Sequence, residues 1–171
     1  MAGITIALLA IRWLRQGQRR KARERLLLTE AVSLNPIDFE RRVQMLLTDL
    51  GWERVEHVGG AGDGGVDLCG RFGGQRYIVQ CKRYRGIVSP THIRDLAGAL
   101  GHEPAERALL VTTGHVSPQT RAWVVNKPID IWDAELLAQH IRQAEDVQRT
   151  PEQIARSHRA TRRFLGILAG V

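Results

Sequence analysis

Three side chains with complementary chemistry occur close together in the sequence: Asp67, Gln80 and Lys82. A carboxylate and a neutral amide oxygen are hard ligands of the kind that bind Mg²⁺, an ion that keeps several of its waters in proteins. Such a metal ion stabilises a phosphoryl oxygen and acidifies a water molecule. An ammonium group beside it can position that water or offset negative charge on a phosphate. Held together, the three side chains would suit the attack of water on a phosphate ester.

A predicted β-hairpin is the element that would hold them together. Its strands cover residues 66–71 and 75–82, and Gly73 and Gly74 form a two-residue loop in which both positions need a positive φ. This register sets Asp67 opposite Gln80, with their Cβ atoms about 5 Å apart. Strand alternation then puts Lys82 on the same face as Gln80. The other face would be apolar and buried, and it would carry Val66, Leu68, Tyr77, Val79 and Cys81.

A helix before the hairpin carries a second acid, Glu40. Asn35 is a candidate N-cap and Pro36 a suitable first helical residue, and the helix is predicted to run to about residue 50. Glu40 follows Phe39 at the edge of the apolar stripe. It therefore either looks inward or is a solvated acid that favours the helix dipole. The stripe consists of Phe39, Val43, Leu46, Leu47 and Leu50.

The remaining elements predict the fold class. A strand is expected over residues 52–58, before a glycine-rich stretch in which Asp63 is either a turn residue or an accessory acid; His57 is assigned no role. Beyond the hairpin, helices and strands alternate: helix from Ser89-Pro90, strand 108–113, helix 119–125, strand 129–132, and a helix from Asp133 to Ile141. Such alternation implies βαβ crossovers. We therefore predict an α/β sandwich with a central mixed β-sheet flanked by helices on both faces.

Composition indicates an anionic partner. The chain has 171 residues, enough for one domain with extensions, and a formal net charge of +7. Its pI near 10.4 favours nucleic acid or an anionic membrane surface as a partner. Arg83 and Arg85 extend the basic surface beside Lys82 and are candidate contacts to a DNA backbone. Two cysteines are too few for a disulfide framework and are expected as free thiols in a reducing cytosol.

On spacing alone, Asp67 and Lys82 could equally form a cross-strand ion pair on a solvated face. A longer set of blocks favours a functional site. Asp67, twelve residues, and then Gln80-Cys81-Lys82 resemble the Asp-(x)n-Glu/Gln-x-Lys signature of the PD-(D/E)xK nucleases. The full set over residues 35–141 resembles the catalytic domain of Mrr-type restriction endonucleases. Its further blocks are Phe39-Glu40, Leu50-Gly51-Trp52, the run from Gly62 to Asp67, Gln80 to Arg83, Val111 to Gly114, and Leu136-Leu137.

The resemblance implies a restriction-endonuclease-like fold and metal-dependent hydrolysis of DNA phosphodiesters. It assigns Asp67, Gln80 and Glu40 to a Mg²⁺ ion, for which Mn²⁺ can substitute, and Lys82 to the attacking water. Many relatives have an acid where Gln80 stands, although the Mrr-type group is similar in using Gln. DNA is then the partner, and cutting of both strands favours a homodimer. The alternative is a DNA-binding module that keeps this fold without cutting.

The two ends of the chain are expected to lie outside this domain. We divide the chain into an apolar and basic helical extension (1–34), the nuclease-like domain (35–142) and a basic helical tail (143–171). The first fourteen residues are apolar except for Thr5 and Arg12, and a basic run follows. They form a helix that packs on its own domain or on a second subunit, a short membrane anchor, or the end of a longer segment. Accordingly the protein is either cytoplasmic or tethered to a membrane and facing the cytoplasm.

Overall fold

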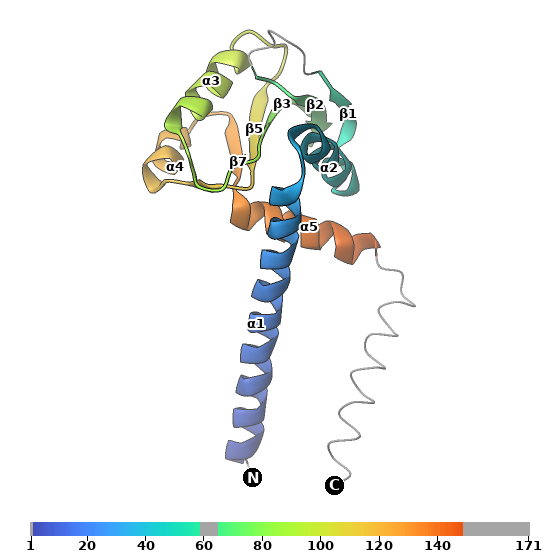
Figure 1. Ribbon diagram of the computed structural model, residues 1–171, viewed down its shortest axis with the longest axis vertical. Helices are drawn as coiled ribbons and strands as arrows, with labels where there is room; N and C mark the ends of the chain where they lie inside the picture. The colour runs from blue at the N-terminus through green and yellow to red at the C-terminus, as the bar shows by residue number, and fades with distance from the viewer. Residues whose placement is uncertain (1, 59–64, 149–171) are drawn as a thin grey trace.

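The fold is an α/β sandwich built on a mixed five-stranded sheet (Figure 1). The computed structural model describes residues 2–58 and 65–148. Asp63 and the tail from residue 149 lie outside the described residues. The sheet has the order β1-β2-β3-β5-β7. Its strands are β1 (Glu53–His57), β2 (Leu68–Phe72), β3 (Gln75–Lys82), β5 (Arg107–Thr112) and β7 (Ile129–Trp132), and β4 (Ile87–Val88) pairs with β6 (His115–Val116) in a separate small sheet.

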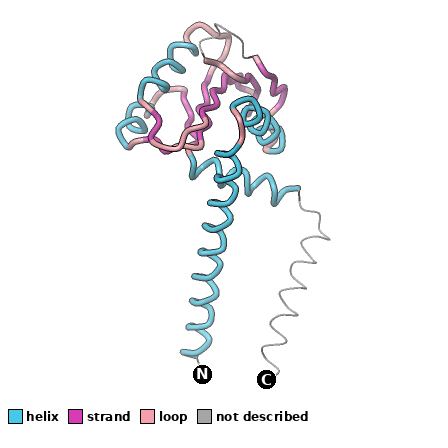
Figure 2. The backbone as a smooth tube through the Cα atoms, viewed as in Figure 1, coloured by secondary structure: helices cyan, strands magenta, loops and turns pink. Residues whose placement is uncertain are grey.

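Helices cover both faces of the sheet, as predicted. They are α1 (Ala2–Ser33), α2 (Pro36–Asp49), α3 (Pro90–Leu100), α4 (Pro118–Val124) and α5 (Ala134–Gln148). One buried cluster combines side chains of α2, α5 and the end of α1 with one face of the sheet. A second cluster joins α3 to the other face, and Val124 of α4 packs against it. Figure 2 shows the strands between these helical layers. The predicted α/β architecture is confirmed.

Two kinds of strand pairing meet in the middle of the sheet. β1, β2 and β3 are antiparallel neighbours, whereas β3, β5 and β7 run parallel. Parallel neighbours need a crossover, and α3 and α4 provide the two crossovers. The carboxyl ends of β3, β5 and β7 therefore meet at one edge, which is where Lys82 lies.

The hairpin has the predicted turn and register. Gly73 and Gly74 have φ values of 58° and 82°, the left-handed conformations that a two-residue hairpin loop requires. Phe72 pairs with Gln75, and Cys69 pairs with Ile78, as expected. The glycine pair therefore fixes which side chains of β2 and β3 share a face.

The register changes at the start of β2. Leu68 faces Val79, and the backbone N–H of Asp67 also donates to the Val79 carbonyl, at 2.9 Å. Two residues opposing one is the pattern of a β-bulge, which re-aims the side chains of the bulged strand. The ladder thus ends one pair short of the expected match between Asp67 and Gln80. Val66 packs with the α3 cluster and Leu68 with the α2 cluster, so the expectation that they share a face is wrong.

Local capping explains where three helices begin. The Asn35 side chain accepts a 2.9 Å hydrogen bond from the N–H of Asp38, and Pro36 occupies the first turn. Ser89 and Ser117 cap α3 and α4 in the same way, each followed by a proline. Such caps satisfy N–H groups that have no partner within the helix. The predicted starts are confirmed, and the buried stripe of α2 holds Phe39, Val43, Leu46 and Leu47.

The last helix is longer than expected because α1 packs against it. α5 continues to Gln148 rather than ending near Ile141. Arg23 pairs with Glu145, and Glu24 pairs with Arg142. The end of α1 therefore packs on the domain. The alternatives for the first fourteen residues remain predictions. Within the part of the chain that the structure describes, no helix has the length and apolar character needed to cross a membrane.

Candidate active site

The Asp67 carboxylate lies against the backbone at the end of β3. Its Oδ2 atom accepts a 2.6 Å hydrogen bond from the N–H of Cys81, the residue between Gln80 and Lys82. The Cys81 side chain is buried in the α2 cluster. Strand alternation turns Gln80 and Lys82 the other way, so they share a face as predicted. The bulge brings the acid to the segment that carries the amide and the ammonium, although at Cys81 rather than opposite Gln80.

Gln80 is held by a close approach of Gly65. The side chain is only 3% exposed, and its Nε2 donates a 2.8 Å hydrogen bond to the Gly65 carbonyl. A Cβ on Gly65 would lie 2.5 Å from this nitrogen, and Gly65 has a φ of 83°. The close contact and the positive φ both explain why residue 65, two residues before Asp67, is a glycine. The Gln80 Oε1 is buried without a hydrogen-bond partner among the described residues. A buried amide oxygen without a partner is costly, so it is a natural place for a ligand.

Glu40 approaches Cys81 from α2, on the face of the sheet that α2 covers. Burial raises the pKa of the Cys81 thiol well above its usual range, and the negative charges of Asp67 and Glu40 raise that pKa further. The Lys82 ammonium acts in the opposite direction. Two carboxylates and one ammonium are therefore within electrostatic range of a single thiol. Of the two alternatives for Glu40, the structure favours the inward-facing one, with its side chain 23% exposed.

His57 is the neighbour that sequence reasoning missed. Its Nδ1 lies 3.8 Å from Oε2 of Glu40. His57 ends β1 and pairs with Leu68, beside the bulge at Asp67. The contact results from the pairing of β1 with β2 and the packing of α2 over them. Nothing in the local sequence around residue 57 indicates that pairing.

The block from Val111 to Gly114 anchors the basic loop that follows Lys82. The Thr112 hydroxyl donates to the Lys82 carbonyl at 2.6 Å. The Thr113 hydroxyl accepts from the N–H of Tyr84 and donates to the Tyr84 carbonyl. A Cβ on Gly114 would lie 2.6 Å from the Gly86 carbonyl oxygen, so glycine permits this approach. The strand end thus fixes the path of residues 83–86.

The two arginines of this loop have different surroundings. Arg83 donates a 3.0 Å hydrogen bond to the Val32 carbonyl in the last turn of α1. A cation at the carboxyl end of a helix is favoured by the helix dipole. Arg85 is exposed. The structure therefore gives Arg83 a role in docking α1, and it leaves Arg85 at the surface, three residues after Lys82.

The donor set suits Mg²⁺ better than a transition metal. Asp67, Glu40 and the Gln80 Oε1 offer hard oxygen ligands, and the last of these has no protein partner among the described residues. Within those residues, no three His, Cys, Asp or Glu side chains form a metal-binding group by themselves. Mg²⁺ needs no such group, because it is commonly held by one or two carboxylates, waters and substrate phosphate. The residues present fit this ion.

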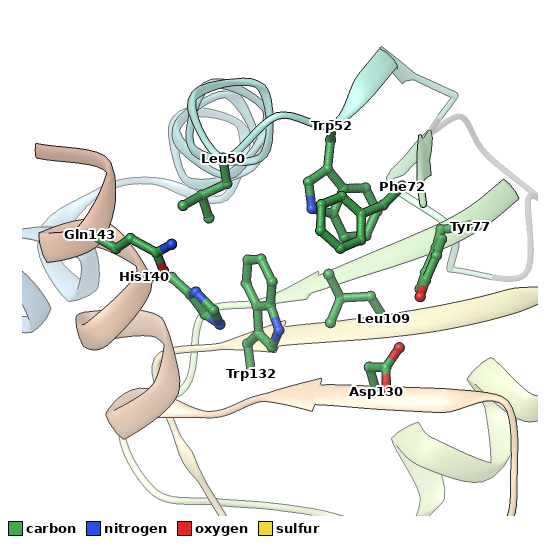
Figure 3. A pocket seen from close by; sticks show the side chains of 9 residues that line it. All are labelled: Leu50, Trp52, Phe72, Tyr77, Leu109, Asp130, Trp132, His140 and Gln143. Carbon is green, nitrogen blue, oxygen red and sulfur yellow. The ribbon is translucent and has the colours of Figure 1, made fainter. Parts of the chain in front are cut away.

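A separate hollow lies at the other end of β3. It has a volume of about 290 Å³ and is lined by five ring-bearing side chains, Trp52, Phe72, Tyr77, Trp132 and His140, together with Leu50, Leu109, Asp130 and Gln143 (Figure 3). The rings pack on one another: the Trp52 and Phe72 centroids are 5.1 Å apart, and those of Trp132 and His140 are 3.9 Å apart. None of the candidate catalytic side chains lines it. We interpret it as an aromatic cluster that joins both edges of the sheet to α5.

Comparisons with known proteins agree with this geometry. A family model described as restriction endonuclease matches residues 31–141. The type IV methyl-directed restriction enzyme EcoKMrr of Escherichia coli strain K12 is 31% identical over 101 residues, covering 55% of this chain and 33% of that protein. An uncharacterized mitochondrial protein of Schizosaccharomyces pombe is 36% identical over 75 residues, covering 40% of this chain and 30% of that protein. The chain spans about a third of the length of these curated relatives.

Two solved structures share the fold. The restriction endonuclease MspJI, in complex with a 27-mer oligonucleotide, gives a TM-score of 0.54 at 19% identity, covering 74% of this chain and 32% of that one. The DNA modification-dependent restriction endonuclease AspBHI gives 0.54 at 21% identity, covering 86% of this chain and 40% of that one. At these identities the likeness concerns the fold. Because the family match covers most of the sequence, this chain belongs to the Mrr-type restriction endonuclease family.

Proposed function

We propose that the protein is a Mg²⁺-dependent endonuclease that hydrolyses DNA phosphodiester bonds at the end of β3. The observation that carries this proposal is the bond from the Cys81 N–H to Asp67, which places an acid at the segment bearing Gln80 and Lys82. Glu40 adds a second carboxylate within range of the same residue. Membership of a restriction endonuclease family and this arrangement of side chains both support hydrolysis of DNA phosphodiesters.

Each residue has a proposed task. Asp67, Glu40 and the Gln80 Oε1 would hold the ion, which when bound supplies stabilisation of negative charge on the phosphate and a more acidic water. Lys82 orients the attacking water and offsets negative charge on the phosphate in the transition state. Gly65 keeps Gln80 in place through its carbonyl. The amide contributes no charge, so ion binding relies more on the two carboxylates than in a site with three acids.

Arg85 and Arg83 would contact the DNA backbone beside this site. Arg85 is exposed on a loop that Thr113 fixes at two points. Arg83 uses one nitrogen for Val32, and a guanidinium has further N–H donors for phosphate. Such contacts depend strongly on salt and weakly on sequence. Loss of Arg85 would therefore weaken binding to all DNA sequences alike.

A plasmid assay tests the proposal. Purified protein with supercoiled plasmid and Mg²⁺ or Mn²⁺ should nick or linearise it, and EDTA should stop the reaction. Asp67→Ala and Lys82→Ala should each abolish cleavage while keeping the far-UV circular dichroism of the wild type. Cleavage by either variant at the wild-type rate would refute the assignment of the site. Because the E. coli relative is methyl-directed, methylated and unmethylated plasmids should be compared.

The second candidate is a DNA-binding module that does not cut. It is favoured by Gln80, which is neutral where many such sites use a carboxylate. The same assay separates the two: salt-sensitive retention of plasmid with no EDTA-sensitive nicking would support the module.

A further inference from the structure

The first half of α1 extends away from the domain with apolar side chains exposed. Figure 1 shows the helix leaving the sheet and its covering helices, and contacts with α5 are made near its end, at Arg23 and Glu24. Farther from the domain, Trp13 is 76% exposed, Leu14 58% and Ile11 44%. Large apolar side chains gathered within one helical turn are a feature that commonly marks an interaction surface.

Toward the N-terminus of α1, the sequence before these residues is also apolar. Residues 2–10 contain one polar side chain, Thr5, and no charge. Toward the domain, the sequence changes from apolar to basic. Residues 12–25 carry seven basic side chains and one acidic one, Glu24; the basic ones are Arg12, Arg15, Arg19, Arg20, Lys21, Arg23 and Arg25. Arg15, Lys21 and Arg25 are exposed. An apolar end therefore adjoins a basic band along one helix.

We propose that this part of α1 binds the surface of an anionic lipid bilayer. Trp13 and Leu14 would enter the interface, where tryptophan is favoured because its ring is apolar and its N–H is polar. Arg15 and Lys21 would meet the lipid phosphates, and basic residues near an anionic membrane surface strengthen binding. The apolar part of the helix would thus lie in the membrane interface, and the basic part would lie beside it at the level of the lipid phosphates.

Charge disfavours a second copy packed in parallel, and apolar exposure disfavours duplex DNA. A second copy packed in parallel along α1 would bring the basic bands of both chains side by side, where like charges repel. Duplex DNA would match the basic band, but it would leave Trp13 and Leu14 uncovered. A lipid surface accounts for both features at once.

Vesicle flotation of the full chain tests this proposal, in EDTA and without DNA so that nuclease activity plays no part. The protein should float with vesicles of phosphatidylcholine and phosphatidylglycerol and much less with phosphatidylcholine alone. Trp13→Ser with Leu14→Ser should weaken partitioning at least about tenfold, because two apolar side chains no longer leave water. Arg15→Gln with Lys21→Gln should reduce the preference for the anionic vesicles, because each basic residue near the surface adds to binding.

A matched control comes from the end of α4. Trp123 and Val125 are 38% and 61% exposed, so Trp123→Ser with Val125→Ser removes a similar pair elsewhere and should leave flotation unchanged. Wild-type flotation of the Trp13/Leu14 variant would overturn the proposal. So would a wild-type protein that stays with the unbound fraction, and light scattering would then show whether α1 joins two copies. Retention of DNA that depends on Arg15 and Lys21, without flotation, would assign the basic band to DNA instead.

Discussion

The Asp67 carboxylate accepts a 2.6 Å hydrogen bond from the backbone N–H of Cys81. The acceptor comes from a β-bulge and the donor from the neighbouring strand, between Gln80 and Lys82. One bond therefore sets the position of the acid relative to the amide and the ammonium. It also means that Asp67 has a structural and a chemical role, and the two roles can be separated by experiment.

Asp67→Asn separates them. The amide oxygen of asparagine can still accept from the Cys81 N–H, so the free energy of unfolding should change by less than about 1 kcal/mol. The charge needed for Mg²⁺ is lost, and the cleavage rate should fall at least about 100-fold. Plasmid cleavage and urea unfolding measure the two effects. Glu103→Gln, at an exposed position after α3, is the control for charge and should keep the wild-type rate.

Gly65→Ala tests the close contact between Gly65 and the Gln80 side chain. Alanine at a φ of 83° costs about 1–2 kcal/mol, and its Cβ would also meet the Gln80 Nε2 at 2.5 Å. We expect a loss of stability greater than the strain alone, together with reduced cleavage because Gln80 shifts. Unfolding and cleavage are measured on the same preparation.

Gly74→Ala is the matched control. Gly74 has nearly the same φ, 82°, and a Cβ there would meet nothing within 4 Å. This variant should show only the strain of the left-handed conformation and retain full cleavage. Equal stability losses for the two variants would mean that the contact with Gln80 does not contribute to the loss of stability in Gly65→Ala.

Local signals explain what could be predicted from the sequence. The paired glycines determine the hairpin register, because only glycine adopts their φ values freely. Asn35-Pro36, Ser89-Pro90 and Ser117-Pro118 mark three helix starts for an equally local reason. The parallel order of β3, β5 and β7 follows from alternation of strands and helices. The fold and the approximate position of the acid, amide and ammonium were therefore predictable.

The features that were missed depend on contacts distant in sequence. The bulge at Asp67 and Leu68 exists only relative to Val79 on the partner strand. The contact of His57 with Glu40 requires β1, β2 and α2 to be assembled. The extra turns of α5 accompany the pairing of Glu145 with Arg23, far apart in the chain. Alternation along one strand cannot reveal any of them.

Gln80→Glu tests whether this residue belongs to the ion site, with a readout other than activity. The carboxylate loses the hydrogen bond that Nε2 donates to the Gly65 carbonyl and faces that oxygen instead. In EDTA the variant should be less stable by about 1–3 kcal/mol. Millimolar Mg²⁺ should raise its melting temperature more than that of the wild type, because a carboxylate binds the ion more strongly than an amide.

Gln143→Glu controls for the added charge at an exposed position on α5 and should respond to Mg²⁺ as the wild type does. An equal shift in melting temperature for Gln80→Glu and the wild type would exclude residue 80 from the ion site. The proposed roles of Asp67 and Glu40 would then have to stand without it.

We expect His140 to make the stability of the protein depend on pH. Burial lowers the pKa of His140 from its usual 6.5, with a hydrogen bond to Gln143 acting in the opposite direction. The ring centroid lies 3.9 Å from that of Trp132 (Figure 3). As the pH falls below 6.5, the unfolded chain takes up a proton that the folded protein resists. The free energy of unfolding should therefore be highest above this pH and decline below it.

His140→Phe should remove that decline, because phenylalanine keeps a ring against Trp132 and does not titrate. Urea unfolding followed by tryptophan fluorescence, at pH values on both sides of 6.5, measures the difference. His102→Gln, at an exposed position after α3, should retain the decline seen in the wild type. A decline of the same size in His140→Phe would place its origin in other titrating groups, and the packing of a neutral imidazole on Trp132 would then contribute nothing to the pH dependence.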